Sequence, residues 1–270
     1  FIRKKIIKDH ESLFLEQVEE LIDKVNIFGY HFASLDIRQD SGIHNDVFKR
    51  IFKEKFGIKM SKKYLEMNED DKINFLSNSK FKSNINDFSD SIVLKTLGSI
   101  NAMRNIQKSN GEKGCHRYII SHNESALNLF EVYYMFKFTG WINPTVDIVP
   151  LFETIDDLNI SVSVMEKVYE NKLYRNHLKS RNNEQVIMLG FSDGTKDGGY
   201  FTANWNILKA KEKLSKKSAK HGIKVKFFDG RGGPPARGGG NTHQFYSSLG
   251  DILSSNEIQL TIQGQTISSN

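Results

Sequence analysis

The chain has little cysteine, little proline and no long apolar run, and each shortage narrows the class of protein. Its 270 residues include one Cys and 4 Pro. The single Cys115 excludes an internal disulfide and a cysteine-based zinc site, and it fits a reducing cytoplasm. No apolar run is long enough to cross a bilayer, so no membrane partner is expected. The first residues also lack the apolar segment of a signal peptide.

Bulky side chains compensate for a modest hydrophobic fraction of 38%, because 19 Phe and 9 Tyr supply core material. Twenty Gly against 4 Pro fits an ordered α/β protein better than a disordered one. The net charge of +6 permits an acidic small-molecule substrate and does not require nucleic acid.

Four short apolar runs, each ending on a charged residue, are the main indication of the fold. Their lengths and polar or Gly-rich boundaries are typical of strands, and helix-like patterns usually separate them, as a parallel sheet requires. When parallel strands close into a barrel, their carboxyl ends meet on the face that carries the chemistry. The runs cover 30–38, 146–153, 186–193 and 223–231, and they end on Arg38, Glu153, Asp193 and Arg231.

Further patterns extend this reading to an α/β fold, a partial (β/α) barrel with many additional helices. Strands are predicted at 115–122 and 258–267, and the polar stretch 60–90 is interpreted as a surface excursion. The last strand pattern has no helix after it, so residues 1–270 are interpreted as an interior fragment of one larger barrel domain. Helices are predicted at about 11–25, 42–57, 91–108, 125–138, 154–174 and 201–221.

The helix predicted at 201–221 combines an apolar and a basic face. Phe201, Trp205 and Leu208 recur at helical spacing and are expected to face the core. The lysines between Lys209 and Lys226 are expected to form the solvated face, although such a run can also follow nucleic-acid phosphates.

Glu153 and Asp193 are the candidate metal ligands. Hard divalent cations prefer carboxylate oxygens, and magnesium often takes only one or two of them from protein. Each acid taken alone fits a solvated loop acid better than a metal ligand. Their equivalent placement after two predicted strands favours a shared site.

Two glycine-rich segments follow predicted strands and suit anion binding. Residues 193–199 include Lys196 where a strand leads into a helix, a setting in which backbone amides can approach an anion. Residues 229–240 surround Arg231 and Arg237 with six glycines, and guanidinium groups bind phosphate or carboxylate with two hydrogen bonds. The alternatives are an ordinary turn for the first segment and a flexible or nucleic-acid-binding tail for the second.

A serine hydrolase is a separate alternative. Residues 190–194 fit the pattern G-x-S-x-G with Ser192 as nucleophile, and His243 lies downstream. The hydrolase turn leads directly into its helix, whereas the sequence here predicts a longer glycine-rich loop first.

Five of these segments, in order, resemble phosphoenolpyruvate carboxylase. The glycine-arginine segment is the most specific of them. The family's chains are much longer, so the resemblance implies the middle part of an α/β barrel with extra helices, usually assembled as a homotetramer. The matching segments are LDIRQDS at 35–41, VPLFETIDD at 149–157, GFSDGTKDGG at 190–199, FDGRGGPPARGGG at 228–240 and TIQGQTI at 261–267.

The resemblance implies carboxylation of phosphoenolpyruvate by bicarbonate to oxaloacetate and phosphate, with Mg²⁺ or Mn²⁺. Carried over by motif, Glu153 and Asp193 hold the metal, and Arg38 and Arg231 hold the substrate phosphate. The same resemblance places Arg237 and Lys196 near bicarbonate or the carboxylated product.

The chain departs from the family pattern in three respects. Asp229 stands where many members carry histidine, and Gly194 stands where serine is common. The family's N-terminal motif with its catalytic histidine, and its C-terminal arginines, are absent from these residues. The 270 residues alone are therefore expected to be inactive.

Overall fold

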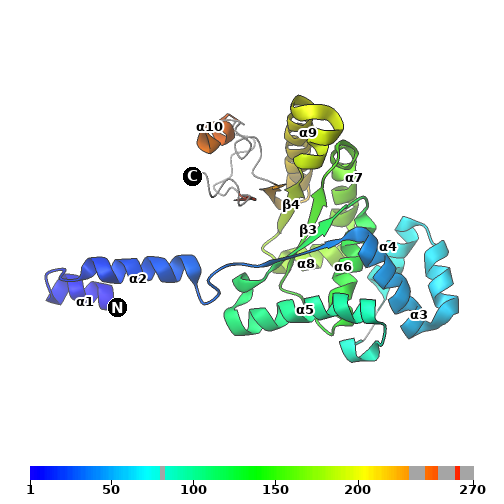
Figure 1. Ribbon diagram of the computed structural model, residues 1–270, viewed down its shortest axis with the longest axis horizontal. Helices are drawn as coiled ribbons and strands as arrows, with labels where there is room; N and C mark the ends of the chain where they lie inside the picture. The colour runs from blue at the N-terminus through cyan, green and yellow to red at the C-terminus, as the bar shows by residue number, and fades with distance from the viewer. Residues whose placement is uncertain (80–82, 231–240, 249–258, 262–270) are drawn as a thin grey trace.

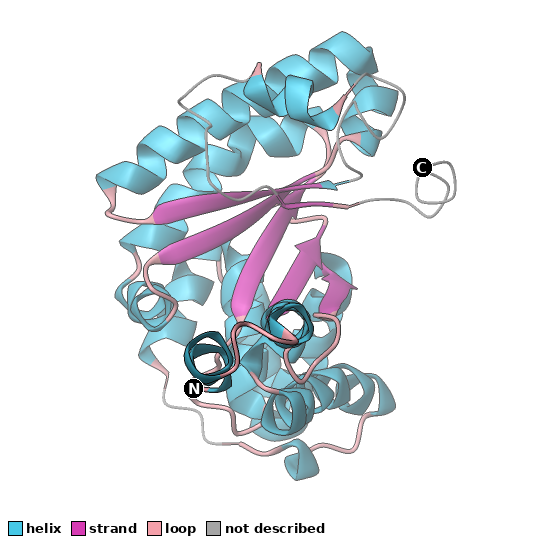
Figure 2. Ribbon diagram, turned by 90° about the vertical axis from the view of Figure 1, so that its left-hand side faces the viewer, coloured by secondary structure: helices cyan, strands magenta, loops and turns pink. Residues whose placement is uncertain are grey.

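The computed structural model describes residues 1–79, 83–230, 241–248 and 259–261, and its centre is a parallel sheet. Six strands pair in the order β1-β2-β3-β4-β5-β6, and every neighbouring pair is parallel. Helices cover the outer side of this curved sheet (Figures 1 and 2). The predicted partial (β/α) barrel is confirmed. The strands are β1 (Asp36–Asp40), β2 (Arg117–Ser121), β3 (Asp147–Phe152), β4 (Glu184–Leu189), β5 (Lys224–Asp229) and β6 (Gln259–Leu260).

Each predicted strand is present, but several ends differ from prediction. The first begins at Asp36, later than expected, so Arg38 lies inside β1. The third apolar run ends its strand at Leu189, and Asp193 belongs to the following helix. β5 ends at Asp229, and Arg231 lies outside the described residues. Most of the strand predicted at 258–267 also lies outside them.

Strand side chains alternate between two apolar clusters, one on each face of the sheet. Ile119, Val149 and Val186 belong to the inner cluster. Their sequence neighbours Ile120 and Ile148 belong to the larger cluster beneath the helices. Burial on both faces is typical of parallel strands between helices. The inner and outer faces of the central strands are therefore largely apolar.

The helices follow the predicted pattern with adjusted ends. Thr154 caps α7, because its side chain accepts from the Asp157 amide. Gly222, just after α9, has a left-handed φ of 68°, as a capping glycine requires. The helices are α1 (Ile2–Asp9), α2 (Leu15–Phe28), α3 (Ser41–Glu66), α4 (Glu69–Asn78), α5 (Ser91–Asn110), α6 (Ala126–Phe138), α7 (Ile155–Glu170), α8 (Lys172–Ser180), α9 (Ser192–Lys220) and α10 (Thr242–Ser247), with short 3-10 turns η1 (Ile85–Asp87) and η2 (Glu112–Gly114).

Helices α1 and α2 project away from the barrel (Figure 1), and neither contains a buried residue. The predicted polar excursion at 60–90 is largely helical, yet it contributes to the core: Tyr64, Leu76 and Phe88 are buried, and Tyr64 stacks on Phe52 with ring centroids 4.3 Å apart. No helix within the described ranges has the length and apolar character needed to span a bilayer.

Two expectations about α9 are wrong. The glycine-rich stretch after Asp193 is not a long loop, because the helix already begins at Ser192 and is interrupted at Gly199, where φ is 78°. The core face is also different: Ala203, Ala210 and Leu214 are buried, whereas the Phe201 side chain is 78% exposed and Trp205 is 51% exposed. Helical periodicity alone does not show which apolar positions the neighbouring elements cover.

The predicted basic face of α9 also contains an exception. Lys211 is buried, only 6% exposed, rather than solvated. It lies three positions before Leu214 and seven before Ser218, both buried, so it follows the core-facing spacing. A buried lysine needs a partner charge, which β5 supplies.

Candidate active site

The carboxyl ends of β1 and β3 meet in an ion pair. Arg38 Nη2 donates to Glu153 Oε1 at 2.8 Å, across 115 residues of sequence. Glu153 directly follows β3, and its side chain is 17% exposed, whereas that of Arg38 is 50% exposed. Since guanidinium has five N–H donors, Arg38 can bind an anion while one donor stays on Glu153.

Glu153 is fixed by contacts from three directions. The backbone amide of His122, at the end of β2, donates to Glu153 Oε2 at 3.0 Å. On the other side, the amides of Glu153 and Thr154 donate to Asp157 Oδ2 at 3.1 and 3.0 Å, which ties the residue to the first turn of α7. The carboxylate orientation is therefore set before any ligand arrives.

Glycine allows the end of β4 to approach Glu153 closely. The Gly190 amide donates to the Phe152 carbonyl at 2.7 Å. A Cβ at Gly190 would lie 2.9 Å from Glu153 Cα, which is too close for any other residue. A Cβ at Gly194 would lie 3.7 Å from the Glu153 carbonyl oxygen. The first turn of α9 therefore packs against Glu153.

Asp193 and Lys196 share this first turn of α9. Lys196 Nζ donates to Asp193 Oδ1 at 2.8 Å, and the side chains are 78% and 47% exposed for Lys196 and Asp193 respectively. Asp193 lies next to Gly194, so two carboxylate residues, Glu153 and Asp193, come from neighbouring strand ends. Both predicted metal ligands are thus on one face of the sheet, together with Arg38.

The donor set at this face fits a hard divalent cation. Both groups are carboxylates, Glu153 is preoriented by two donors, and the missing side chain of Gly190 lets Glu153 pack directly against the end of β4. Within the described ranges, no cluster of three or more His, Cys, Asp and Glu side chains is arranged to hold a metal. A pair of carboxylates suits magnesium, which keeps several waters or substrate oxygens among its ligands.

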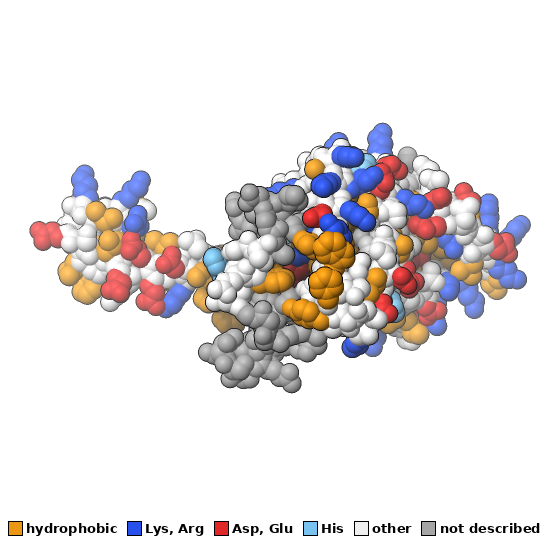
Figure 3. All heavy atoms as spheres, turned by 90° about the horizontal axis from the view of Figure 1, so that it is seen from above, with side chains coloured by type: hydrophobic (Ala, Val, Ile, Leu, Met, Phe, Trp, Pro, Cys, Tyr) orange, Lys and Arg blue, Asp and Glu red, His pale blue; other side chains and the backbone are white. Residues whose placement is uncertain are grey.

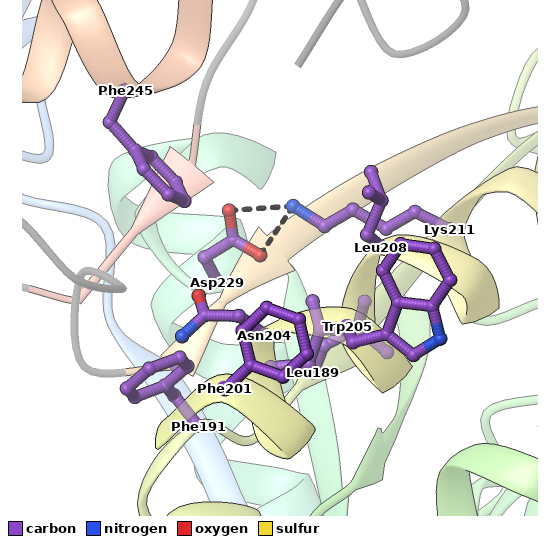
Figure 4. A pocket seen from close by; sticks show the side chains of 11 residues that line it. Leu189, Phe191, Phe201, Asn204, Trp205, Leu208, Lys211, Asp229 and Phe245 are labelled. Carbon is purple, nitrogen blue, oxygen red and sulfur yellow. Dashed lines mark hydrogen bonds and ion pairs between the residues drawn. The ribbon is translucent and has the colours of Figure 1, made fainter. Parts of the chain in front are cut away.

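Asp229, the residue at the family's frequent histidine position, takes part in a buried network (Figure 4). Lys211 Nζ lies 2.7 Å from Asp229 Oδ1 and 2.8 Å from Oδ2. The Tyr246 hydroxyl of α10 donates to Oδ2 at 2.7 Å. Burial and the neighbouring Asp229 carboxylate raise the pKa of Tyr246, so the phenol remains a donor at neutral pH. Asp229 therefore links β5, α9 and α10.

An apolar pocket of about 180 Å³ lies beside this network. Phe191, Phe201, Trp205 and Phe245 contribute to its lining (Figure 4). Figure 3 looks onto this side of the molecule and shows apolar side chains grouped at the surface beside lysines and arginines. The sequence prediction placed Phe201 and Trp205 in the core, so this exposed surface was not foreseen.

The structure pairs Arg38 with Glu153 and Lys196 with Asp193 at the same end of the sheet, and a metal ion shared by the two carboxylates stays a prediction. Two other predicted residues cannot be compared. Arg231 and Arg237 lie outside the described residues. His122 was not among the predicted site residues, yet its backbone amide contributes to this site. Its position at the end of the strand predicted at 115–122 was the available signal.

Comparisons with known proteins point to one family. The family model of phosphoenolpyruvate carboxylase matches residues 1–270. The chain is 35% identical over 276 residues to the phosphoenolpyruvate carboxylases of Nitrosomonas eutropha and Nitrosomonas europaea, covering 97% of this chain and 29% of each relative. It is 32% identical over 269 residues to that of Gloeobacter violaceus, covering 93% of this chain and 28% of the relative.

The chain therefore spans less than a third of the length of these curated relatives. The match nevertheless extends over all of its residues and includes the strand ends that carry Arg38, Glu153 and Asp193. The chain belongs to the phosphoenolpyruvate carboxylase family.

Proposed function

We propose that the protein containing this chain condenses phosphoenolpyruvate with bicarbonate to give oxaloacetate and phosphate, with Mg²⁺ or Mn²⁺ as cofactor. The supporting observation is the preoriented Arg38–Glu153 pair beside the first turn of α9, in a chain of this family. An anion-binding cation next to two carboxylates is what a phosphorylated substrate and a divalent ion require.

Glu153 and Asp193 would hold the metal ion. When bound, such an ion supplies positive charge that stabilises the negative charge developing on the substrate. Glu153 contributes a carboxylate already oriented by Arg38 and by the His122 amide, so little reorganisation is needed on binding.

Arg38 would bind the substrate phosphate, together with Arg231 from beyond the end of β5. Half of the Arg38 side chain is exposed, and only one of its nitrogens is given to Glu153 at 2.8 Å. Lys196 and Arg237 would contact bicarbonate or the carboxylated product. The exposed ammonium of Lys196 stands at the same strand ends, which supports this role.

The complete protein is the unit to which this activity is assigned, because the relatives are more than three times as long as the chain. We expect the 270 residues alone not to turn over. Assembly as a homotetramer and a cytoplasmic location are further expectations for the complete protein. Family membership does not favour the serine-hydrolase alternative at Ser192.

The direct test is an assay of the complete protein with phosphoenolpyruvate and bicarbonate, coupled to malate dehydrogenase and NADH. We expect oxidation of NADH that requires both substrates, is abolished by a chelator and is restored by Mg²⁺ or Mn²⁺. The 270-residue chain serves as the parallel sample. Turnover without metal, or no turnover from the complete protein, would refute the proposal.

A further inference from the structure

His122 interrupts the regular pairing of β2 with β3. The pairs Arg117↔Asp147 and Ile119↔Val149 set a parallel register in which the His122 amide would next bond to the Leu151 carbonyl. Instead, the Asn123 amide takes that carbonyl, at 3.3 Å. One residue has therefore been added to β2 at this point, which is the definition of a bulge.

The added residue has an uncommon backbone conformation. His122 has a left-handed φ of 56°, which residues with a Cβ adopt rarely and mostly where surrounding contacts enforce it. Two contacts do so here: Ser41 Oγ donates to the His122 carbonyl at 2.5 Å, and the His122 amide donates to Glu153 Oε2 at 3.0 Å. The bulge thus redirects an amide from the strand ladder to a side chain of the candidate site.

We propose that His122 is a positioning residue that orients Glu153 for the metal ion through its backbone amide. The inference rests on the proposed function, because it gives Glu153 the role of metal ligand. The amide holds Oε2 while Arg38 holds Oε1 at 2.8 Å, so the carboxylate plane is fixed by donors from the two strands that precede β3. Groups that orient a metal ligand commonly change metal affinity by about 10–100-fold when they are removed.

The imidazole is not what the proposal requires. Its Nδ1 lies 3.6 Å from Asp40 Oδ2, beyond hydrogen-bond distance, and the side chain is largely exposed. The amide contact depends on the left-handed conformation. Glycine and asparagine adopt that conformation readily, whereas the β-branched valine does not.

The test compares three substitutions at one position in the complete protein: His122→Gly, His122→Asn and His122→Val. Manganese binding is measured by the electron paramagnetic resonance signal of free Mn²⁺, without substrate, and Mg²⁺ half-activation is measured in the coupled assay. We expect His122→Val to weaken Mn²⁺ binding about 10-fold, with glycine and asparagine within about twofold of the parent. Ser41→Ala, which removes the donor to the His122 carbonyl, should weaken it by about threefold and remains informative if the valine variant does not fold.

Asn182→Val is the matched control, because Asn182 has a φ of 57° in the exposed turn before β4, at the opposite end of the sheet. It should lower the melting temperature without changing Mn²⁺ affinity. Equal binding by the valine, glycine and asparagine variants would overturn the proposal. So would equal losses in all three, since the imidazole would then be the active part. A parent protein that neither binds Mn²⁺ nor carboxylates would overturn the proposed function as well, whereas an active parent with indistinguishable variants refutes the positioning role alone.

Discussion

Two carboxylate–cation pairs lie at strand ends of the same sheet, and they differ in their exposure to solvent. Arg38 and Glu153 pair at 2.8 Å with the arginine half exposed. Lys211 and Asp229 pair at 2.7 Å, and both side chains are nearly buried, at 7% and 12% exposed. Each pair joins a cationic side chain to a carboxylate, but the free energy needed to break the two pairs differs.

An exposed pair contributes about 0–1 kcal/mol, and the Arg38–Glu153 pair is closer to this case than the Lys211–Asp229 pair because Arg38 is 50% exposed, although Glu153 is 17% exposed. Removing one member of a buried pair costs about 3–5 kcal/mol, because the other charge remains without solvent. Arg38 can therefore leave or share Glu153 when an anion binds, whereas Lys211 has to stay on Asp229. The Arg38–Glu153 pair is thus suited to ligand exchange, whereas the Lys211–Asp229 pair is suited to joining β5 to α9.

The largest effect on stability should come from Lys211→Met. Among the described residues it leaves the buried Asp229 carboxylate with the Tyr246 hydroxyl as its remaining side-chain partner, so we expect about 3–5 kcal/mol of destabilisation in urea unfolding of the complete protein. Lys213→Met, at an exposed position on the same helix, should change stability by less than about 0.5 kcal/mol. Adding Asp229→Asn to Lys211→Met should recover part of the loss. Equal stability of the two methionine variants would show that the buried Lys211 contributes no more to stability than the exposed Lys213.

Glu153→Gln should lower activity strongly and stability little, whereas Lys211→Met acts mainly on stability. The amide keeps the size of the side chain but removes a negative charge from the metal site, so kcat/KM should fall about 100–1000-fold. The melting temperature should stay within about 2 °C of the parent. Glu166→Gln, which breaks the surface pair with Lys217, is the control and should retain full activity. Retained metal-dependent turnover in Glu153→Gln would remove Glu153 from the site.

A third carboxyl group, that of Glu131, is fully buried, and among the described residues it does not pair with a cation. It accepts a hydrogen bond from the neutral amide of Asn45, with Nδ2 3.3 Å from Oε1, so it shows what burial does without a charged partner. Burial raises its pKa from 4.5 to about 8. Between those values the unfolded chain has released a proton that the folded protein retains, so stability falls as pH rises from about 4.5 to about 8. Glu131→Gln should flatten this dependence, and melting curves across the pH range measure it. An unchanged slope would show that Glu131 is not responsible.

The smallest effect is expected from Tyr246→Phe. It removes one donor from Asp229 while Lys211 remains in place, so we expect a loss of about 1–2 kcal/mol. Tyr200→Phe, at an exposed position, should be neutral within about 0.5 kcal/mol in the same unfolding experiment. A loss as large as that of Lys211→Met would mean that the Tyr246 hydroxyl stabilises Asp229 as much as the ion pair does.

The strand ends could be predicted from sequence because each depends on a short local pattern. An apolar run followed by a charge located Glu153 correctly, since β3 ends at Phe152. The same reasoning misplaced the start of β1, because the apolar residues from Tyr30 to Leu35 resemble a strand in sequence, whereas the chain turns there and Phe32 has a left-handed φ of 59°.

The remaining features depend on distant parts of the chain. Lys211 was assigned to the solvated face because its partner, Asp229, is 18 residues away and on another element. Trp205 was assigned to the core because periodicity does not reveal what covers a helix. The bulge at His122 depends on Ser41, 81 residues away. Arg231 and Arg237 lie outside the described residues, so their roles stay predictions.

The bulge at His122 also affects how this family can be read by evolutionary comparison. Because the donor to Glu153 is a main-chain amide, any residue that tolerates the left-handed conformation preserves it. Selection then acts on the backbone conformation and not on the identity of the side chain. The side chain at such a position can vary among homologues while its backbone conformation is still required to orient Glu153. A conservation profile would then rank the position below neighbours that contribute less to the site.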